Sequence, residues 1–295
     1  ISPNGAEVAG NITNAQWYLA IGLLILLLLT PAASRRTLVF ELLFVLVAGL
    51  TGPFILLLLP VMALLLWVNR AAPLARRRIF LFIVAAVASA SVQAYALMNH
   101  GINEPGISTA NLQFIDYLTA TPVITFIHVL APYFRAVNSV FHLEHILSKS
   151  IFYTSISLIT LFVALILSSL FRKNYVVEKT VFAYFGAVIL FSSFYKCRNI
   201  LHDLLYFENG DRYFFIPGVL LAWLLVLMLE DNIVKYAAIT LISLLIISSM
   251  FYYRRTPLID YQWPYWLDKA NADSRIKIPI NPPGWSINMR CEEPS

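Results

Sequence analysis

Arg212 and Tyr213 form the residue pair with the clearest chemical potential in this chain. They stand where a polar loop meets an apolar run that starts at Tyr213. A guanidinium at such a boundary can hold a lipid phosphate through two parallel hydrogen bonds. It can equally anchor the segment by extending its charge toward water. Residue type alone leaves both interpretations open, and Arg212 with Tyr213 is our candidate lipid-phosphate site.

Two further groups of polar and aromatic side chains are candidate substrate contacts. His202 and Asp203 precede the pair in the same loop and can contact a sugar hydroxyl or carry a proton, although solvated side chains are the simpler interpretation. Trp263 and Trp266 belong to an aromatic cluster near the C-terminal end. Such a cluster either rests on a bilayer surface or stacks on the apolar faces of sugar rings.

A metal site is not predicted. His142, Glu144 and His145 form the pattern H-x-E-H, in which the two histidines share one face of a helix. A zinc site would need a third ligand, and only His128 or Asp116 lies near in sequence. A wet polar helix face explains the pattern better. The motifs of common soluble enzymes (the Walker loop, GxGxxG, HExxH and GxSxG) are absent.

The chain has two cysteines, Cys197 and Cys291. Both fall on the outer side of the membrane topology derived below, where oxidation is permitted. They are a candidate disulfide, with two unrelated thiols as the simpler alternative.

The composition predicts a membrane protein. The 295 residues are 59% hydrophobic and only 13% charged, with a mean hydropathy of +0.74, whereas soluble domains are about a quarter charged. The apolar residues are gathered in long runs separated by polar loops. We therefore predict an all-α polytopic membrane protein with about eight transmembrane helices. The expected crossings are 17–33, 38–50, 54–68, 79–98, 151–171, 180–195, 213–229 and 236–253.

The segment 114–149 is apolar on average but carries too many ionisable groups for a crossing, so we expect interfacial or re-entrant helices there. The transmembrane domain is then 1–253, with an outer loop at 99–150, and the tail is 254–295. Alternating residues in Arg275–Ile280 and a returning Trp285–Met289 predict a small β-hairpin in this tail.

The basic residues predict the orientation. The proposed inner loops carry ten: Arg35, Arg36, Arg70, Arg76, Arg77, Arg78, Arg172, Lys173, Lys179 and Lys235. The longer outer segments before the tail carry five: Arg135, Lys149, Lys196, Arg198 and Arg212. Positive charge prefers the cytoplasmic side. Both termini are therefore expected to be extracytoplasmic. This placement between apolar runs also argues against a nucleic-acid partner.

Three features inside the apolar runs bear on packing. The break Thr51-Gly52-Pro53 predicts the tip of a helical hairpin, because glycine permits the turn and proline ends the helix. Gln93 lies among small residues, where an amide can bond across a close helix contact. Glu41 lies near Arg36 and is expected to pair or to extend toward the inner surface.

Three stretches together resemble a known class of protein. Asn11–Trp17 opens the first apolar run, and Gly49–Phe54 spans the break. Asp211–Pro217 opens the seventh crossing, with Pro282-Pro283-Gly284-Trp285 in the tail. In this order they resemble the C-terminal portion of polytopic bacterial membrane proteins of surface-polysaccharide loci, which look like GT-C-type glycosyltransferases.

The resemblance implies transfer of a sugar from a polyprenyl-phosphate donor to a glycan or lipid acceptor. The transfer is expected on the extracytoplasmic side of the bacterial inner membrane. In this class an acidic residue in the first outer loop acts as base or metal contact. No residue here matches it, so it is expected upstream of Ile1. No catalytic residue is assigned, and the cofactor stays open, a divalent metal ion being what the resemblance allows.

The expected partners are membrane lipids, the lipid-linked sugar, and either a protein partner or a missing N-terminal portion. A non-catalytic membrane subunit is the main alternative. A transporter or flippase ranks third, because ionisable residues lie mostly at the ends of the expected crossings.

Overall fold

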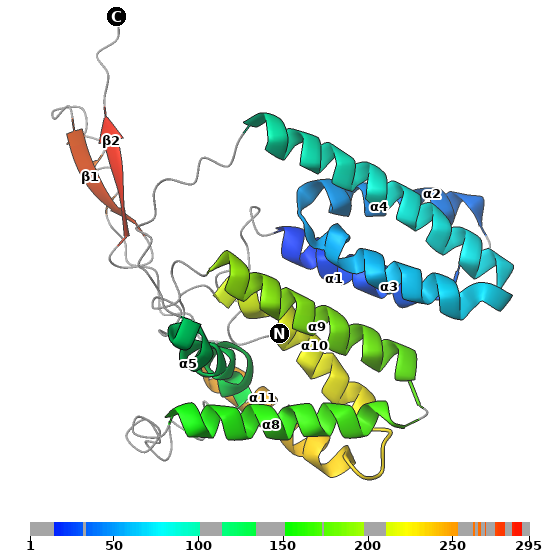
Figure 1. Ribbon diagram of the computed structural model, residues 1–295. Coiled ribbons are helices and arrows are strands. Elements are labelled where there is room, and N and C mark those ends of the chain that lie inside the picture. Colours follow the sequence, from blue (N-terminus) through cyan, green and yellow to red (C-terminus); the bar gives the residue numbers. More distant parts are fainter. Residues whose placement is uncertain are drawn as a thin grey trace, which may run out of the picture. The chain divides into compact units, whose positions relative to one another are not determined.

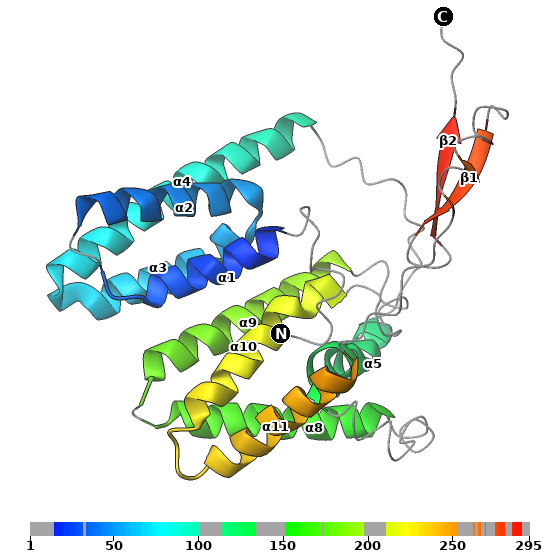
Figure 2. The same cartoon turned by 180° about the vertical axis from the view of Figure 1, so that it is seen from behind.

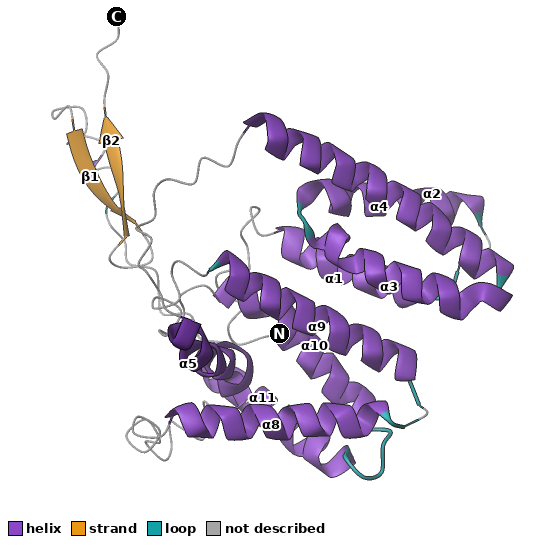
Figure 3. Cartoon of the chain, in the orientation of Figure 1, coloured by secondary structure: helices purple, strands orange, loops and turns teal. Residues whose placement is uncertain are grey.

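The computed structural model describes residues 15–31, 34–100, 114–133, 151–172, 174–197, 211–252, 262, 265–266, 269, 275–280 and 285–290. Within these ranges the regular structure is mostly helical, and two strands lie near the C-terminal end (Figure 3). The contacts divide the chain into two compact units, Ile1–Phe251 and Tyr252–Ser295.

The first unit begins with helices that alternate in direction (Figure 1). They are α1 (Ala15–Leu28), α2 (Arg35–Thr51), α3 (Phe54–Val68) and α4 (Pro73–His100), with a 3₁₀ turn η2 (Asn69–Ala71) before α4. Helix α1 ends before Ala33, the expected limit of the first crossing, because Pro31 excludes the preceding residue from helical geometry. Helices α2 and α3 are separate, with Gly52 in extended conformation between them. The helix break predicted at Thr51-Gly52-Pro53 is therefore present.

The remaining helices of the first unit are α5 (Phe114–Thr125), the π-helical η3 (Phe126–Leu130), α8 (Ile151–Leu170), α9 (Val176–Lys196), α10 (Asp211–Met228) and α11 (Lys235–Tyr252). In η3 the Ala131 N–H donates to the Phe126 carbonyl, five residues back. Pro132 follows directly and has no N–H to donate, which disturbs the regular α-helical ladder at this point. Figure 2 shows α8, α10 and α11 from behind.

Two apolar clusters form the core of this unit. One gathers buried side chains of α1, α2, α3, α4, α9 and α10, and the other those of α5, η3, α8, α10 and α11. Helix α10 belongs to both: Ile216 and Leu220 lie in the first cluster, Leu221 and Leu225 in the second. The two pairs lie on opposite sides of the helix, so α10 packs against both clusters.

The outer surface of the described helices is strongly apolar. Phe40 is 72% exposed, Phe191 73% and Met250 74%. Within the described residues, four helical segments are long and apolar enough to cross a bilayer: Phe54–Ala71, Pro73–Ala96, Phe152–Leu170 and Val176–Lys196. Shorter apolar helices accompany them at Ala15–Leu28, Ala120–Tyr133, Arg212–Met228 and Lys235–Met250. Apolar helices with apolar exposed faces are consistent with a membrane protein.

Small residues and one amide bring α2 and α4 together. An added Cβ at Gly49 would lie 2.6 Å from the Ser89 Cβ, closer than such atoms approach. The Gln93 side-chain amide donates to the Gly49 carbonyl at 2.6 Å. This is the cross-helix contact that the surrounding small residues predict, and it depends on the missing side chain at Gly49.

The second unit contains an antiparallel two-stranded sheet. Strand β1 (Arg275–Ile280) pairs with β2 (Trp285–Arg290), with Arg275 opposite Arg290 and Ile280 opposite Trp285. Elsewhere in this unit the Trp266 ring packs against the Tyr265 ring at a centroid distance of 5.4 Å.

Candidate functional site

Three aromatic residues from distant parts of the chain meet in the first unit. Trp17 of α1 and Phe54 of α3 have ring centroids 4.7 Å apart. Trp17 and Tyr213 of α10 meet edge to face at 6.1 Å. We call Trp17, Phe54 and Tyr213 the aromatic junction. Aromatic pairs in these geometries contribute beyond their apolar area, so the junction joins the starts of α1, α3 and α10.

The helix break beside Phe54 is held close to α1. An added Cβ at Gly52 would lie 2.6 Å from the Gln16 Oε1 and 3.2 Å from the Gln16 Cβ. Gly52 has an extended backbone that any residue can adopt, so space and not backbone conformation requires glycine here. The close approach brings Phe54 to Trp17.

Arg212 lies at the edge of the aromatic junction. Its guanidinium carbon is 5.0 Å from the centroid of the Tyr213 ring, and its Nη2 donates to the Tyr213 hydroxyl at 3.4 Å. Both residues are partly buried. The aromatic face therefore supports one side of the guanidinium, which has five donors in a planar fork for a phosphate or carboxylate.

The Trp17 indole adds an unusual polar group to the same place. Trp17 is 6% exposed, and its Nε1 has no hydrogen-bond partner in the described part of the chain. Buried polar atoms are nearly always paired, and each exception calls for an explanation. Because the Trp17 ring contacts the Tyr213 ring, this unpaired N–H belongs to the aromatic junction.

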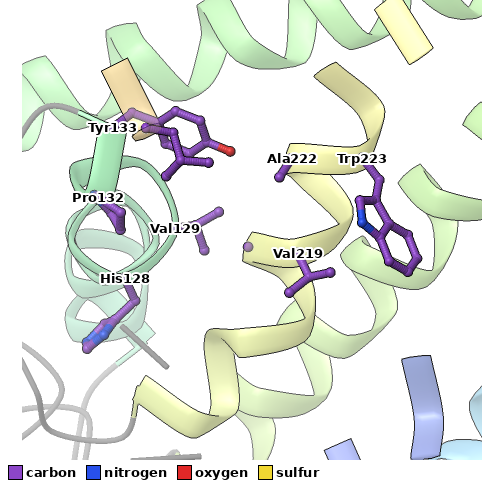
Figure 4. A pocket seen from close by; sticks show the side chains of 9 residues that line it. His128, Val129, Pro132, Tyr133, Val219, Ala222 and Trp223 are labelled. Carbon is purple, nitrogen blue, oxygen red and sulfur yellow. The ribbon is translucent and has the colours of Figure 1, made fainter. Parts of the chain in front are cut away.

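A hollow lies further along α10, where the sequence predicts no site. It has a volume of about 90 Å³ and is lined by His128, Val129, Pro132, Tyr133, Gly218, Val219, Ala222, Trp223 and Leu245. The side chains come from η3 and the turn after it, from α10 and from α11 (Figure 4). His128 is 2% exposed and stacks on Phe214 with ring centroids 4.5 Å apart.

The sequence offers His128 as a possible third metal ligand beside His142 and His145, which lie outside the described residues. Its π-helical position was signalled by Pro132, four residues later, which removes a regular helical donor. Among the described residues, no three His, Cys, Asp or Glu side chains are grouped to hold a metal ion. The structure thus places His128 in an apolar packing contact with Phe214.

The described structure does not test whether the other predicted site residues lie near Arg212. His202, Asp203 and Trp263 lie outside the described residues. Trp266 belongs to the second unit, where the Lys269 ammonium lies 5.5 Å from its ring centroid. Cys197 is buried directly after α9, and its candidate partner Cys291 is again outside the described residues. The disulfide and the sugar contacts remain predictions.

No protein-family model, no curated protein and no solved structure matches this chain.

Proposed function

We propose that this chain binds the phosphate of a polyprenyl-phosphate-linked sugar at Arg212 and Tyr213, as part of a GT-C-like glycosyltransferase of the bacterial inner membrane. In this proposal eight helices cross the membrane, both termini of the chain are extracytoplasmic, and the sugar acceptor is a glycan or a lipid. The Arg212 end of α10 then lies at the outer interface, where lipid phosphates are found.

One observation supports this function best. The three stretches that carry the resemblance to GT-C-type enzymes are far apart in sequence, yet Trp17, Phe54 and Tyr213 from those stretches form the aromatic junction. Arg212 stands on the Tyr213 ring at the edge of this junction. Packing needs alone explain the apolar contacts, but they do not require a partly buried guanidinium at the same place.

The test is binding of geranylgeranyl phosphate to the full chain in phosphatidylcholine nanodiscs. A charge-assisted bidentate contact contributes about 1.5–3 kcal/mol, so Arg212→Ala should weaken binding by roughly tenfold or more. Arg212→Lys keeps the charge and loses the planar fork, so it should also bind more weakly. Arg172→Ala is the matched control, since Arg172 is a half-exposed arginine in the α8–α9 loop. It should bind as the unmodified chain does.

Competing ligands identify the source of the phosphate. Dioleoyl phosphatidate and inorganic phosphate carry the same headgroup chemistry on a different chain or on none. If phosphatidate displaces geranylgeranyl phosphate at equal concentration, Arg212 recognises lipid phosphates in general and the polyprenyl assignment fails. Normal affinity in a folded Arg212→Ala variant would remove the proposed site altogether and favour the non-catalytic membrane subunit.

A further inference from the structure

Pro217 interrupts the hydrogen bonding of α10 one turn after the Arg212–Tyr213 pair. In an α-helix the N–H of each residue donates to the carbonyl four residues earlier. Proline has no N–H, so the Tyr213 carbonyl loses the donor that residue 217 would otherwise supply. A carbonyl in the interior of a bundle needs a replacement donor.

Ser193 of α9 supplies that donor. Its Oγ lies 2.7 Å from the Tyr213 carbonyl oxygen, and the side chain is 4% exposed. The same Oγ is 2.8 Å from the Ile189 carbonyl of its own helix. A serine hydroxyl has one proton. Because the Ile189 carbonyl already accepts a backbone N–H within α9, the Tyr213 carbonyl is the acceptor that depends on Ser193.

The contact between α9 and α10 continues below this bond. The Phe182 and Trp223 rings lie 5.4 Å apart, and an added Cβ at Gly186 would be 3.7 Å from a Leu220 methyl, an ordinary contact distance. The apolar contacts hold the lower part of α10 against α9. The hydroxyl bond from Ser193 ties down the first turn, which carries Arg212 and Tyr213.

We propose that Ser193 is a positioning residue for the phosphate site. By replacing the hydrogen bond that Pro217 removes, it holds the first turn of α10 against α9 and so orients the Arg212 guanidinium and the Tyr213 ring toward a phosphate. This inference rests on the proposed lipid-phosphate function. This role depends on the N–H that Pro217 lacks and on the Ser193 hydroxyl that replaces it. The effect of removing the Ser193 hydroxyl should therefore depend on whether residue 217 is proline.

The experiment is a double-mutant cycle on the full chain in phosphatidylcholine nanodiscs, with geranylgeranyl phosphate as the probe. Ser193→Ala should weaken binding about three- to tenfold, the value of one lost hydrogen bond, and lower the unfolding midpoint by about 2–4 °C. Pro217→Ala restores an N–H for the Tyr213 carbonyl. In that background Ser193→Ala should change neither quantity appreciably.

Two further variants keep the test decisive. Ser193→Thr retains the hydroxyl and should bind within about twofold of the unmodified chain, allowing for the added methyl group. Ser249→Ala is the matched control, because the Ser249 hydroxyl donates to Leu245 within its own helix. It should leave binding unchanged.

The outcomes separate this inference from the proposed function. If Ser193→Ala weakens phosphate binding equally with and without Pro217→Ala, the positioning role is overturned. It is also overturned if Ser193→Ala binds normally while Arg212→Ala binds weakly. If Arg212→Ala binds normally, the phosphate function fails. The hydrogen-bond replacement would then still be supported by a dependence between Ser193 and Pro217 in the unfolding midpoints.

Discussion

Arg78 in α4 holds both carboxylate oxygens of Glu41 in α2, with Nε to Oε2 at 2.8 Å and Nη2 to Oε1 at 2.9 Å. The two side chains are 5% and 11% exposed. The same guanidinium donates to the carbonyls of Leu29 at 2.8 Å and Leu26 at 2.9 Å. These carbonyls belong to the C-terminal end of α1, where cations and donors are favourable. One side chain thus joins three helices.

Replacing Arg78 should destabilise the bundle strongly. Arg78→Met leaves a buried carboxylate and the end of α1 without their donors, and breaking such a pair costs about 3–5 kcal/mol. Arg77→Met is the control, since Arg77 is the exposed neighbour. Unfolding in mixed micelles measures both. Adding Glu41→Leu to Arg78→Met should recover part of the loss, and a double variant as unstable as the sum would contradict this account.

Gly49 and Gly186 should respond differently to the same added methyl group. A Cβ at Gly49 would meet the Ser89 Cβ at 2.6 Å, whereas a Cβ at Gly186 would lie 3.7 Å from a Leu220 methyl. We expect Gly49→Ala to cost about 1–3 kcal/mol through overpacking. Gly186→Ala should be neutral or stabilising by up to about 1 kcal/mol through helix propensity. Unfolding midpoints test the contrast, and equal shifts would mean that α2 and α4 do not pack this closely.

Tyr175 should titrate at higher pH than an ordinary tyrosine. It donates to Glu230 at 3.3 Å, across the α8–α9 and α10–α11 loops, and the Glu230 charge raises the pKa of its phenol. A raised pKa means that this contact is intact below the ordinary tyrosine pKa of about 10 and is lost as the pH rises through the raised value. Glu230→Gln should therefore lower the pKa of Tyr175.

The measurement for Tyr175 is an ultraviolet titration from which the same titration of Tyr175→Phe is subtracted. Glu178 makes a smaller contribution of the same sign, so Glu178→Gln serves as the graded control and should lower the pKa less. An unchanged curve in Glu230→Gln would show that the two loops do not meet in solution.

The proposed topology predicts which positions are reachable from outside the cell. With Cys197 and Cys291 replaced by serine, Arg76→Cys should resist an impermeant maleimide in sealed cells, because Arg76 lies in the first turn of α4, at the end expected to face the cytoplasm. Asp273→Cys in the tail should react. Both should react after permeabilisation, which controls for accessibility. Equal reaction in sealed cells would reject eight crossings with both termini outside.

Local structure could be predicted from the sequence where a single residue type determines it. The helix break before Phe54 follows from Pro53, which lacks an N–H and keeps the preceding residue out of helical geometry, and the contact of Gln93 follows from small neighbours. The partner of Glu41 was not predictable. Arg36 is near in sequence, but Arg78, 37 positions away, is brought to Glu41 only by the packing of α2 on α4.

Lys179 was misjudged for a related reason. It counted among the residues of an inner loop, yet α9 begins at Val176, and Lys179 is 1% exposed with its ammonium donating to the Ser169 carbonyl at 3.3 Å. That carbonyl lies in the last turn of α8, which attracts cations. The positive charge of a lysine predicts the side of the membrane on which it lies. Whether the apolar stem of Lys179 is buried depends on how α8 and α9 pack.

The position of α10 in both apolar clusters has a consequence for biosynthesis. The helices before it emerge from the ribosome first, and each cluster then lacks the side chains that α10 contributes. Neither cluster can reach its final packing until this late segment enters between its neighbours, because unfilled cores lose contacts. Chains truncated before Asp211 should therefore remain loosely packed in both clusters.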